Sequence, residues 1–313
     1  MLSGPKRQHF LPRFYLEGFS RNGLLAVFDR EKKEIRLQQP ENTAVIGHFY
    51  TLEDAEGRRR FEIEALLSDY EGKASPVIRK LIAREDLTAD ERSDLAIFIA
   101  FAAMRTPDMV NSVQAMNGHF IAQTAKAMFQ DIDQVLAELR TDKREENISD
   151  ADLRRQAEWM VDMAQNDKLI VQTDEKWAVR TTIRMAMAAA PYLAGRDWRV
   201  VHRDNEKQSF ITTDAPVFLG TVAPRPTSIY GVGFGSQDAF VSFPLEQSCV
   251  LQMYGETGNL EHKEAGRDYI RQANLALGER CQRFLVGRDQ ELVKSLTDVL
   301  GLADKTWQSK IRI

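Results

Sequence analysis

Five side chains of the sequence have the types that acid–base and anion chemistry require. A histidine titrates near neutral pH and can act as a general acid or base. An arginine offers a planar fork of donors to an anion, and carboxylates can orient water or hold Mg²⁺. The candidates for such a site are His9, Glu64, Glu71, Arg105 and Asp214.

His9 stands in the stretch "QHFLPRFYLEGFS". Pro12 suits the first position of a short helix, which places Leu11, with no side-chain acceptor, at the cap. The first N–H groups of that helix then need another partner, and an anion beside His9 could supply it. The alternative is a buried histidine that fixes the N-terminal segment in place.

Arg105 follows ten apolar residues, 95–104, and precedes Thr106-Pro107. The apolar run predicts a helix buried on all sides, opened by a capping box at Thr88. Proline and the cap before it predict a break between Met104 and Asp108. Arg105 then either satisfies the last helix carbonyls or serves as an anion clamp.

Glu64 and Glu71 are seven residues apart, so they share one face of the predicted helix. They are either solvated charges at the edge of that face, or half-buried carboxylates with a raised pKa that could bind a metal. Asp214 follows the strand-like "SFITT". It is either a carboxylate aimed by a strand end, or a turn residue that caps its own backbone.

Helical periodicity dominates residues 61–190, whereas short β-type runs recur over 196–254. An N-terminal hairpin is predicted over residues 24–40. The order of these elements predicts an α+β fold, with a helical middle and a predominantly antiparallel sheet built from the hairpin and the 196–254 region.

The length favours one large domain, 1–313, with a sub-domain boundary near 131–150 or 191–196. Locally, the pattern predicts one strand through 44–52 and a bend or restart at Pro76.

It also predicts a helix end near Pro191 and a helix over 263–281.

The formal net charge of −4 argues against a generally basic nucleic-acid binder. The longest apolar run is half the length of a membrane span, so no membrane association is expected. Cys249 and Cys281, the only cysteines, form no zinc pattern and fit a cytoplasmic protein.

Several of these stretches, in order along the chain, resemble the DUF4238 family. They include the His-x-x-Pro-x-x-Tyr-Leu-x-x-Phe opening at His9, "VFDREKKEI", "GHFYTL", "RTP" at 105–107 and "FITTDAPV" at 210–217. Family members often carry Asn where this chain has Ala215. The family is functionally uncharacterised, so the resemblance marks positions and implies no reaction.

These residues suggest an intracellular hydrolase or phosphodiesterase, with a nuclease as the narrower form. His9 would act as acid or base, Arg105 would stabilise negative charge, and the carboxylates would orient water or hold Mg²⁺. Nucleic acid or a nucleotide would be the substrate partner. The alternative is a non-catalytic module that binds an anionic ligand or a protein. The sequence does not decide whether the chain has a protein partner or forms a homo-oligomer.

Overall fold

The computed structural model describes residue 4 and residues 6–141, 148–171, 174–223 and 231–304. This part of the chain divides into two compact units. One unit runs to Val110 and resumes at Val179, and the other covers Asn111–Ala178. All five candidate site residues belong to the first unit. Residues 142–147, within one of the predicted boundary regions, lie outside the described residues.

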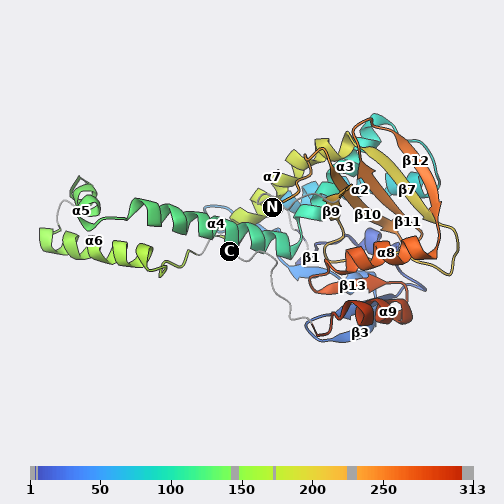
Figure 1. Ribbon diagram of the computed structural model, residues 1–313, viewed down its shortest axis with the longest axis horizontal. Helices are drawn as coiled ribbons and strands as arrows, with labels where there is room; N and C mark the ends of the chain where they lie inside the picture. The colour runs from blue at the N-terminus through green and yellow to red at the C-terminus, as the bar shows by residue number, and fades with distance from the viewer. Residues whose placement is uncertain (1–3, 5, 142–147, 172–173, 224–230, 305–313) are drawn as a thin grey trace. The chain divides into compact units, whose positions relative to one another are not determined.

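The helical middle predicted for residues 61–190 is confirmed, because six helices follow one another between Glu62 and Ala194 (Figure 1). None of the helices in the described ranges is long and apolar enough to cross a membrane. The α-helices are α1 (Arg13–Glu17), α2 (Glu62–Ile82), α3 (Ala89–Met104), α4 (Pro107–Met128), α5 (Ile132–Thr141), α6 (Asp150–Gln165), α7 (Glu175–Ala194), α8 (Arg267–Gly278) and α9 (Gln290–Leu300), and a 3₁₀ turn, η1, spans Pro40–Asn42.

The strands form predominantly antiparallel sheets, which confirms the predicted α+β class. The larger sheet is mixed, because its edge strand β12 runs parallel to β7. Its order is β12 (Leu260–Ala265), β7 (Asp197–Arg203), β11 (Cys249–Tyr254), β10 (Ala239–Glu246) and β9 (Phe218–Thr221).

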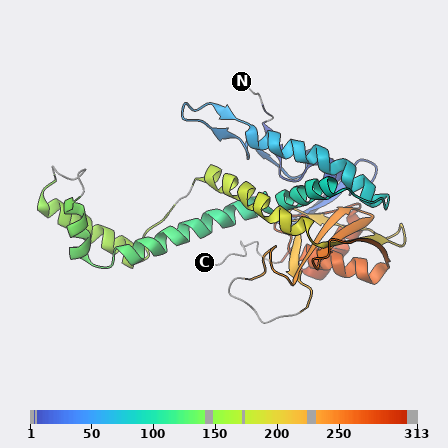
Figure 2. The same ribbon diagram turned by 90° about the horizontal axis from the view of Figure 1, so that it is seen from above.

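The N-terminal hairpin forms as predicted but belongs to a second sheet. That sheet has the order β3 (Glu34–Gln38), β2 (Leu25–Asp29), β13 (Phe284–Gly287) and β8 (Thr212–Thr213). The hairpin therefore pairs with a strand more than 250 residues away, which local patterning cannot indicate. Two short pairs complete the structure: β1 (Arg7–His9) with β4 (Val45–Gly47), and β5 (Leu52–Glu53) with β6 (Arg59–Arg60). Figure 2 shows the β5–β6 hairpin, in light blue, leading into α2.

Helices cover both faces of the larger sheet. On one face, Ile270 of α8 packs against Val201 and Val250. On the other face, Phe98 of α3 meets the ring of Phe243, with centroids 6.1 Å apart. Alternation along the strands explains this division, because successive side chains of a strand point to opposite faces.

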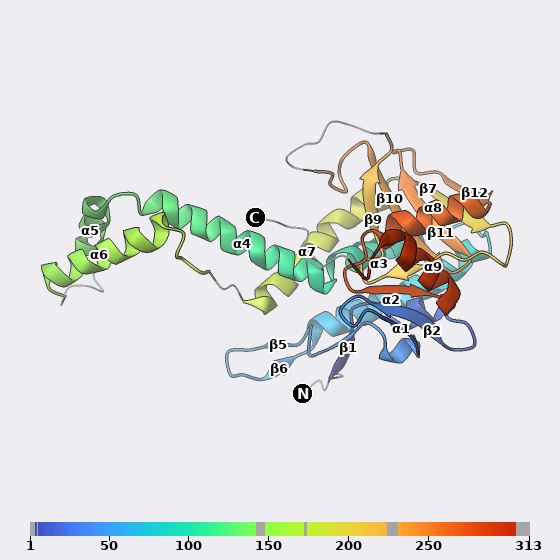
Figure 3. The ribbon, with the colours of Figure 1, turned by 60° about the horizontal axis from the view of Figure 1, so that its bottom comes forward.

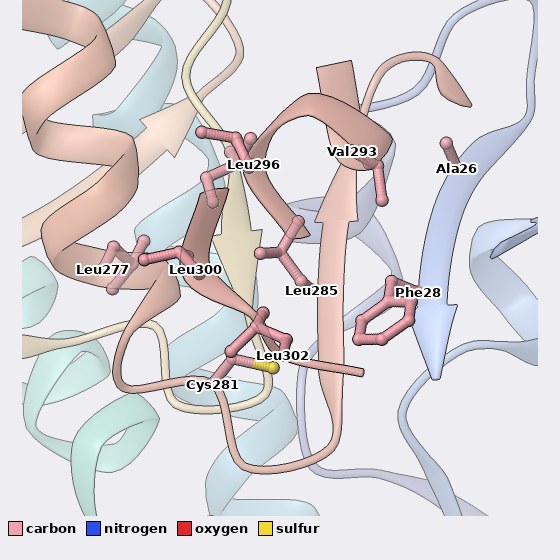
Figure 4. Packing of buried hydrophobic residues seen from close by; sticks show 10 residues of the cluster. Ala26, Phe28, Leu277, Cys281, Leu285, Val293, Leu296, Leu300 and Leu302 are labelled. Carbon is pink, nitrogen blue, oxygen red and sulfur yellow. The ribbon is translucent and has the colours of Figure 1, made fainter. Parts of the chain in front are cut away.

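The second sheet has its own core, formed with α8 and α9 (Figures 3 and 4). Leu285 of β13 is fully buried between Phe28 of β2 and Leu296 of α9. Gly301 ends α9 with φ of 60°, a left-handed conformation that glycine adopts without steric cost. The two sheets are thus joined by α8, which contributes to both cores.

The unit formed by Asn111–Ala178 is helical throughout its described elements. Its α5 and α6 pack against each other through a small cluster of buried side chains, Val135, Leu136, Leu153 and Ala157. Ser149 caps α6 by accepting a hydrogen bond from the N–H of Asp152. None of the candidate site residues lies in this unit.

Four local predictions were wrong in part. The predicted strand over 44–52 is interrupted, because Ala44 and His48 adopt left-handed φ values of 56° and 54° on either side of β4. Helix α2 continues through Pro76 without a restart.

Helix α7 likewise passes Pro191 and ends at Ala194, whereas α8 begins at Arg267 because residues 260–265 pair with β7.

The predicted break at Pro107 is confirmed. Helix α3 ends at Met104 and α4 begins at Pro107, with Arg105 in the bridge region at φ −91° and ψ 8°. Thr88 and Glu91 form the expected capping box at the start of α3. The apolar run between these limits is almost entirely buried.

Phe98 should contribute strongly to stability, because its side chain is 1% exposed and contacts the rings of Phe14 and Phe243. We expect Phe98→Ala to lower the free energy of unfolding by about 3–5 kcal/mol through lost transfer energy and a cavity. Chemical denaturation of both proteins measures the difference. A loss under about 1 kcal/mol would contradict the buried-helix interpretation.

Candidate functional site

Arg105 is the buried centre of the candidate site. Its side chain is 1% exposed, and its Nη1 donates to Oε1 of Glu71 at 2.7 Å. Nε and Nη2 of the same guanidinium are buried and find no hydrogen-bond partner among the described residues. Buried donors are normally satisfied, so these two N–H-bearing nitrogens favour the anion-clamp interpretation over one in which Arg105 only closes α3.

Helix α2 supplies both glutamates of the site. Glu71 lies beside the guanidinium and keeps 26% of its side chain exposed. Glu64, one heptad earlier, is half-buried, and burial raises the pKa of its carboxyl group above the usual value. The charge of Glu71 raises this pKa further, whereas Arg105 opposes the shift. The prediction of one shared face is confirmed, and Glu64 is a carboxyl group biased toward its protonated form.

His9 lies close enough to this pair to respond to its charges. Burial lowers the pKa of the His9 imidazole, and a backbone hydrogen bond with Glu41 and the charge of Glu71 oppose the shift. Arg7 and Arg105 lower the pKa further. Nε2 of the ring is buried without a hydrogen-bond partner in the described ranges. A neutral imidazole with an unused nitrogen is the arrangement that a general base requires.

The predicted helix-mouth setting of His9 was wrong. His9 is the last residue of β1 and pairs with Val45 of β4. The cap of α1 is Pro12 rather than Leu11, and α1 has only five residues. So short a helix has little dipole to offer an anion. The cationic side chains near His9 that could attract an anion are Arg7 and Arg105.

Two residues that sequence reasoning missed position the site. The fully buried Gln8 accepts a hydrogen bond from the Tyr50 backbone at 2.6 Å and donates to Thr51 Oγ1 at 3.1 Å. The hydroxyl of Tyr50 then donates to the carbonyl oxygen of Arg105 at 3.1 Å. Gln8 adjoins His9 in the opening motif, and Tyr50 belongs to "GHFYTL", so the two motifs are linked through the end of α3.

Asp214 has a different environment from the other four residues. Its carboxylate accepts hydrogen bonds from the backbone N–H groups of Gln282 and Arg283, at 2.9 and 2.6 Å. Its own N–H donates to the carbonyl of Phe284. Burial raises the pKa of Asp214 to about 6, and the charge of Asp108 adds to the shift. These contacts tie β8 to the start of β13. Asp214 therefore caps backbone groups that are distant in sequence, rather than its own backbone as in a turn.

A magnesium ion fits this site poorly. Mg²⁺ is usually held by one or two ionised carboxylates together with several waters. Glu71 already accepts from Arg105, and burial raises the pKa of Glu64, which weakens it as a metal ligand. Among the residues that the structure describes, no three His, Cys, Asp or Glu side chains could together hold a metal ion. The arrangement instead resembles an anion site with an acid and a base beside it.

Two further polar clusters were not predicted. Asp29 accepts from both Nε and Nη2 of Arg283, each at 3.2 Å, which fastens β2 to β13. His202 and His262 share a hydrogen bond of 3.0 Å between Nε2 and Nδ1, and burial lowers the pKa of His202 to about 4. The histidines are 60 residues apart and meet because β7 and β12 are neighbours.

The sequence matches the family described as "Protein of unknown function (DUF4238)" over residues 7–291. The chain belongs to this family, and the match contains all five candidate residues. No curated protein and no solved structure gives a significant match.

The Arg105–Glu71 pair should respond asymmetrically to mutation. Glu71→Gln leaves a buried guanidinium without its counter-charge, and we expect a loss of about 3–5 kcal/mol in the free energy of unfolding. Arg105→Met keeps an apolar side chain in the interior and leaves the Glu71 carboxylate unpaired but partly exposed to water. The loss in the free energy of unfolding should therefore be smaller. Denaturation of both variants measures the difference, and equal losses would show that the exposure of Glu71 is irrelevant.

Asp214 should make stability depend on pH. Between its ordinary pKa of 3.8 and the folded value of about 6, the folded state binds more protons than the unfolded state. The free energy of unfolding should therefore fall as pH rises through this window, by about 3 kcal/mol, and change no further above it. Asp214→Asn should lack this component. Parallel curves for wild type and variant between pH 4 and 7 would contradict the raised pKa.

Proposed function

We propose that this chain is a hydrolase of phosphodiesters whose site is formed by His9, Glu64, Glu71 and Arg105. One observation carries the proposal: a buried guanidinium with two unused donor atoms lies beside a histidine and a carboxyl group whose pKa values shift in opposite directions. Pairs of groups with such opposed shifts are typical of acid–base assignments.

In the proposed reaction, the side chains that cover Arg105 move aside, and its Nε and Nη2, which are buried in the structure, bind the non-bridging oxygens of the phosphodiester. Neutral His9 accepts a proton from water as the water oxygen bonds to phosphorus. The phosphorus–oxygen bond to the leaving group breaks, and protonated Glu64 donates its proton to that oxygen. Glu71 holds the guanidinium in place and does not react. Arg105 stabilises the negative charge that develops in the transition state.

The proposed substrate is a phosphodiester of nucleotide size. The net charge of −4 disfavours a long polyanion, so nucleic acid is the second substrate to test. The proposed setting is the cytoplasm, which fits the free, buried thiols of Cys249 and Cys281.

Turnover of bis(p-nitrophenyl) phosphate and of single-stranded DNA tests the proposal, with and without added Mg²⁺. We expect His9→Ala to lower kcat by about 10²–10⁴-fold, the usual contribution of a general base. The rate should rise as His9 loses its proton and fall as Glu64 does. The profile should therefore be bell-shaped, with its acidic limb below the ordinary imidazole pKa of 6.5 and its alkaline limb above the ordinary carboxyl pKa of 4.5. Glu64→Gln should remove the alkaline limb of this profile.

His119→Ala is the matched control, because His119 lies in α4 within the other unit. Asp214→Asn should leave turnover near that of the wild type at a temperature where both are folded. Equal rates for wild type and His9→Ala would refute the catalytic role of the site.

The engagement of Asp214 with backbone amides supports a second candidate, a non-catalytic module that binds an anion through Arg105. Fewer reacting groups are needed for binding than for hydrolysis. Binding of a phosphodiester that survives in His9→Ala, without turnover in wild type, would favour this second function.

A further inference from the structure

A polar cleft of about 480 Å³ lies between α8, α9 and the loop 205–209. Its walls carry the cationic side chains of Lys207, Arg267, Arg271 and Arg288. These come from three separate segments of the chain, so the cleft is a product of tertiary folding. Asn274 at its base is buried and is fixed by hydrogen bonds to Ile211 and Ser209.

Two of the charged groups in the cleft serve the structure. Arg288 donates to the carbonyl oxygens of residues 206–208 and to the carboxylate of Asp289. Asp289 also caps α9 by accepting from the N–H of Leu292 at 2.9 Å. This pair holds the 205–209 loop against the start of α9 and thereby shapes one wall.

The other charges are not balanced. Lys207, Arg267 and Arg271 make no ion pair within the described ranges, and the only remaining carboxylate of the lining is Glu291. Two positive charges are therefore in excess. Arg267 and Arg271 are four residues apart on α8 and face the same cleft. Lys207 and Arg267 are exposed to water, which screens their repulsion, but three cations around one concave site create a positive potential that attracts an anion.

We propose that this cleft binds a phosphate-bearing small molecule. A dianionic or polyanionic phosphate neutralises the excess charge, and two arginines can each offer it a fork of donors. The cleft lies among residues 205–296 and contains none of the groups assigned to hydrolysis. The proposal is therefore independent of the function proposed above.

Isothermal titration calorimetry with inorganic pyrophosphate tests the site on the full chain. We expect one equivalent of binding that weakens about 10–100-fold in Arg271→Gln, because a charge-assisted hydrogen bond is lost. Lys207→Gln should weaken it in the same direction. Arg21→Gln removes an exposed arginine outside the cleft and should leave the affinity unchanged. Citrate, titrated in parallel, should bind at least tenfold more weakly if phosphate geometry is recognised.

The His9→Gln variant tests whether pyrophosphate binds in this cleft or at the Arg105 site. It should retain the pyrophosphate binding. Loss of binding in His9→Gln, with retention in both Arg271→Gln and Lys207→Gln, would assign the anion to the other site and overturn the proposal. Absence of pyrophosphate binding by the wild type at millimolar concentration would also overturn it. Two cleft variants are used so that a folding defect in one, detected by circular dichroism, does not decide the result.

Discussion

The ion pair between Arg105 and Glu71 is the interaction on which the candidate site depends. A guanidinium that is 1% exposed requires a counter-charge, and Glu71 supplies it from a different helix. The pair thereby fixes α2 against the junction of α3 and α4. The same ion pair also fixes the position of Glu64, because Glu64 lies on the same face of α2 two turns earlier. Tyr50 adds a neutral contact to the Arg105 carbonyl, so both the main chain and the side chain of this residue are held.

The position of Arg105 follows from the helix break. Within the apolar run 95–104 of α3 most side chains are buried, and a charged side chain inside that run would lie among apolar neighbours. The Met109 N–H, which a continuous helix would donate to the Arg105 carbonyl, donates to Thr106 Oγ1 at 3.3 Å, which leaves the Arg105 carbonyl available to Tyr50. The break therefore places a charge in the interior and provides the hydrogen bond that holds it. Within the part of the chain that the structure describes, two donor atoms nevertheless find no partner, a cost that natural proteins usually accept at functional sites.

Sequence patterns predicted those features of the structure that depend on residues close together in the chain. The capping box at Thr88, the break at Pro107 and the shared face of Glu64 and Glu71 each depend on residues within two turns of one another. The partners of Asp214 are backbone amides at positions 282–284, and the hairpin 25–38 pairs with a strand at 284–287. No periodicity encodes such long-range pairing. Ala44 and His48 were also beyond prediction, because non-glycine residues rarely adopt left-handed conformations.

Charge distribution connects the two proposed sites in the larger unit. The chain as a whole is acidic, yet unpaired donors of Arg105 and unbalanced cations of the α8–α9 cleft concentrate positive potential at two places. A distributed basic surface would attract any polyanion, whereas an isolated cationic cleft on an acidic protein selects anions small enough to enter it. The Arg105 site offers a buried fork with an acid and a base, which suits bond cleavage. The cleft offers several cations and no neighbouring acid–base pair, which suits binding alone. The different surroundings of similar charges thus favour different roles for the two sites.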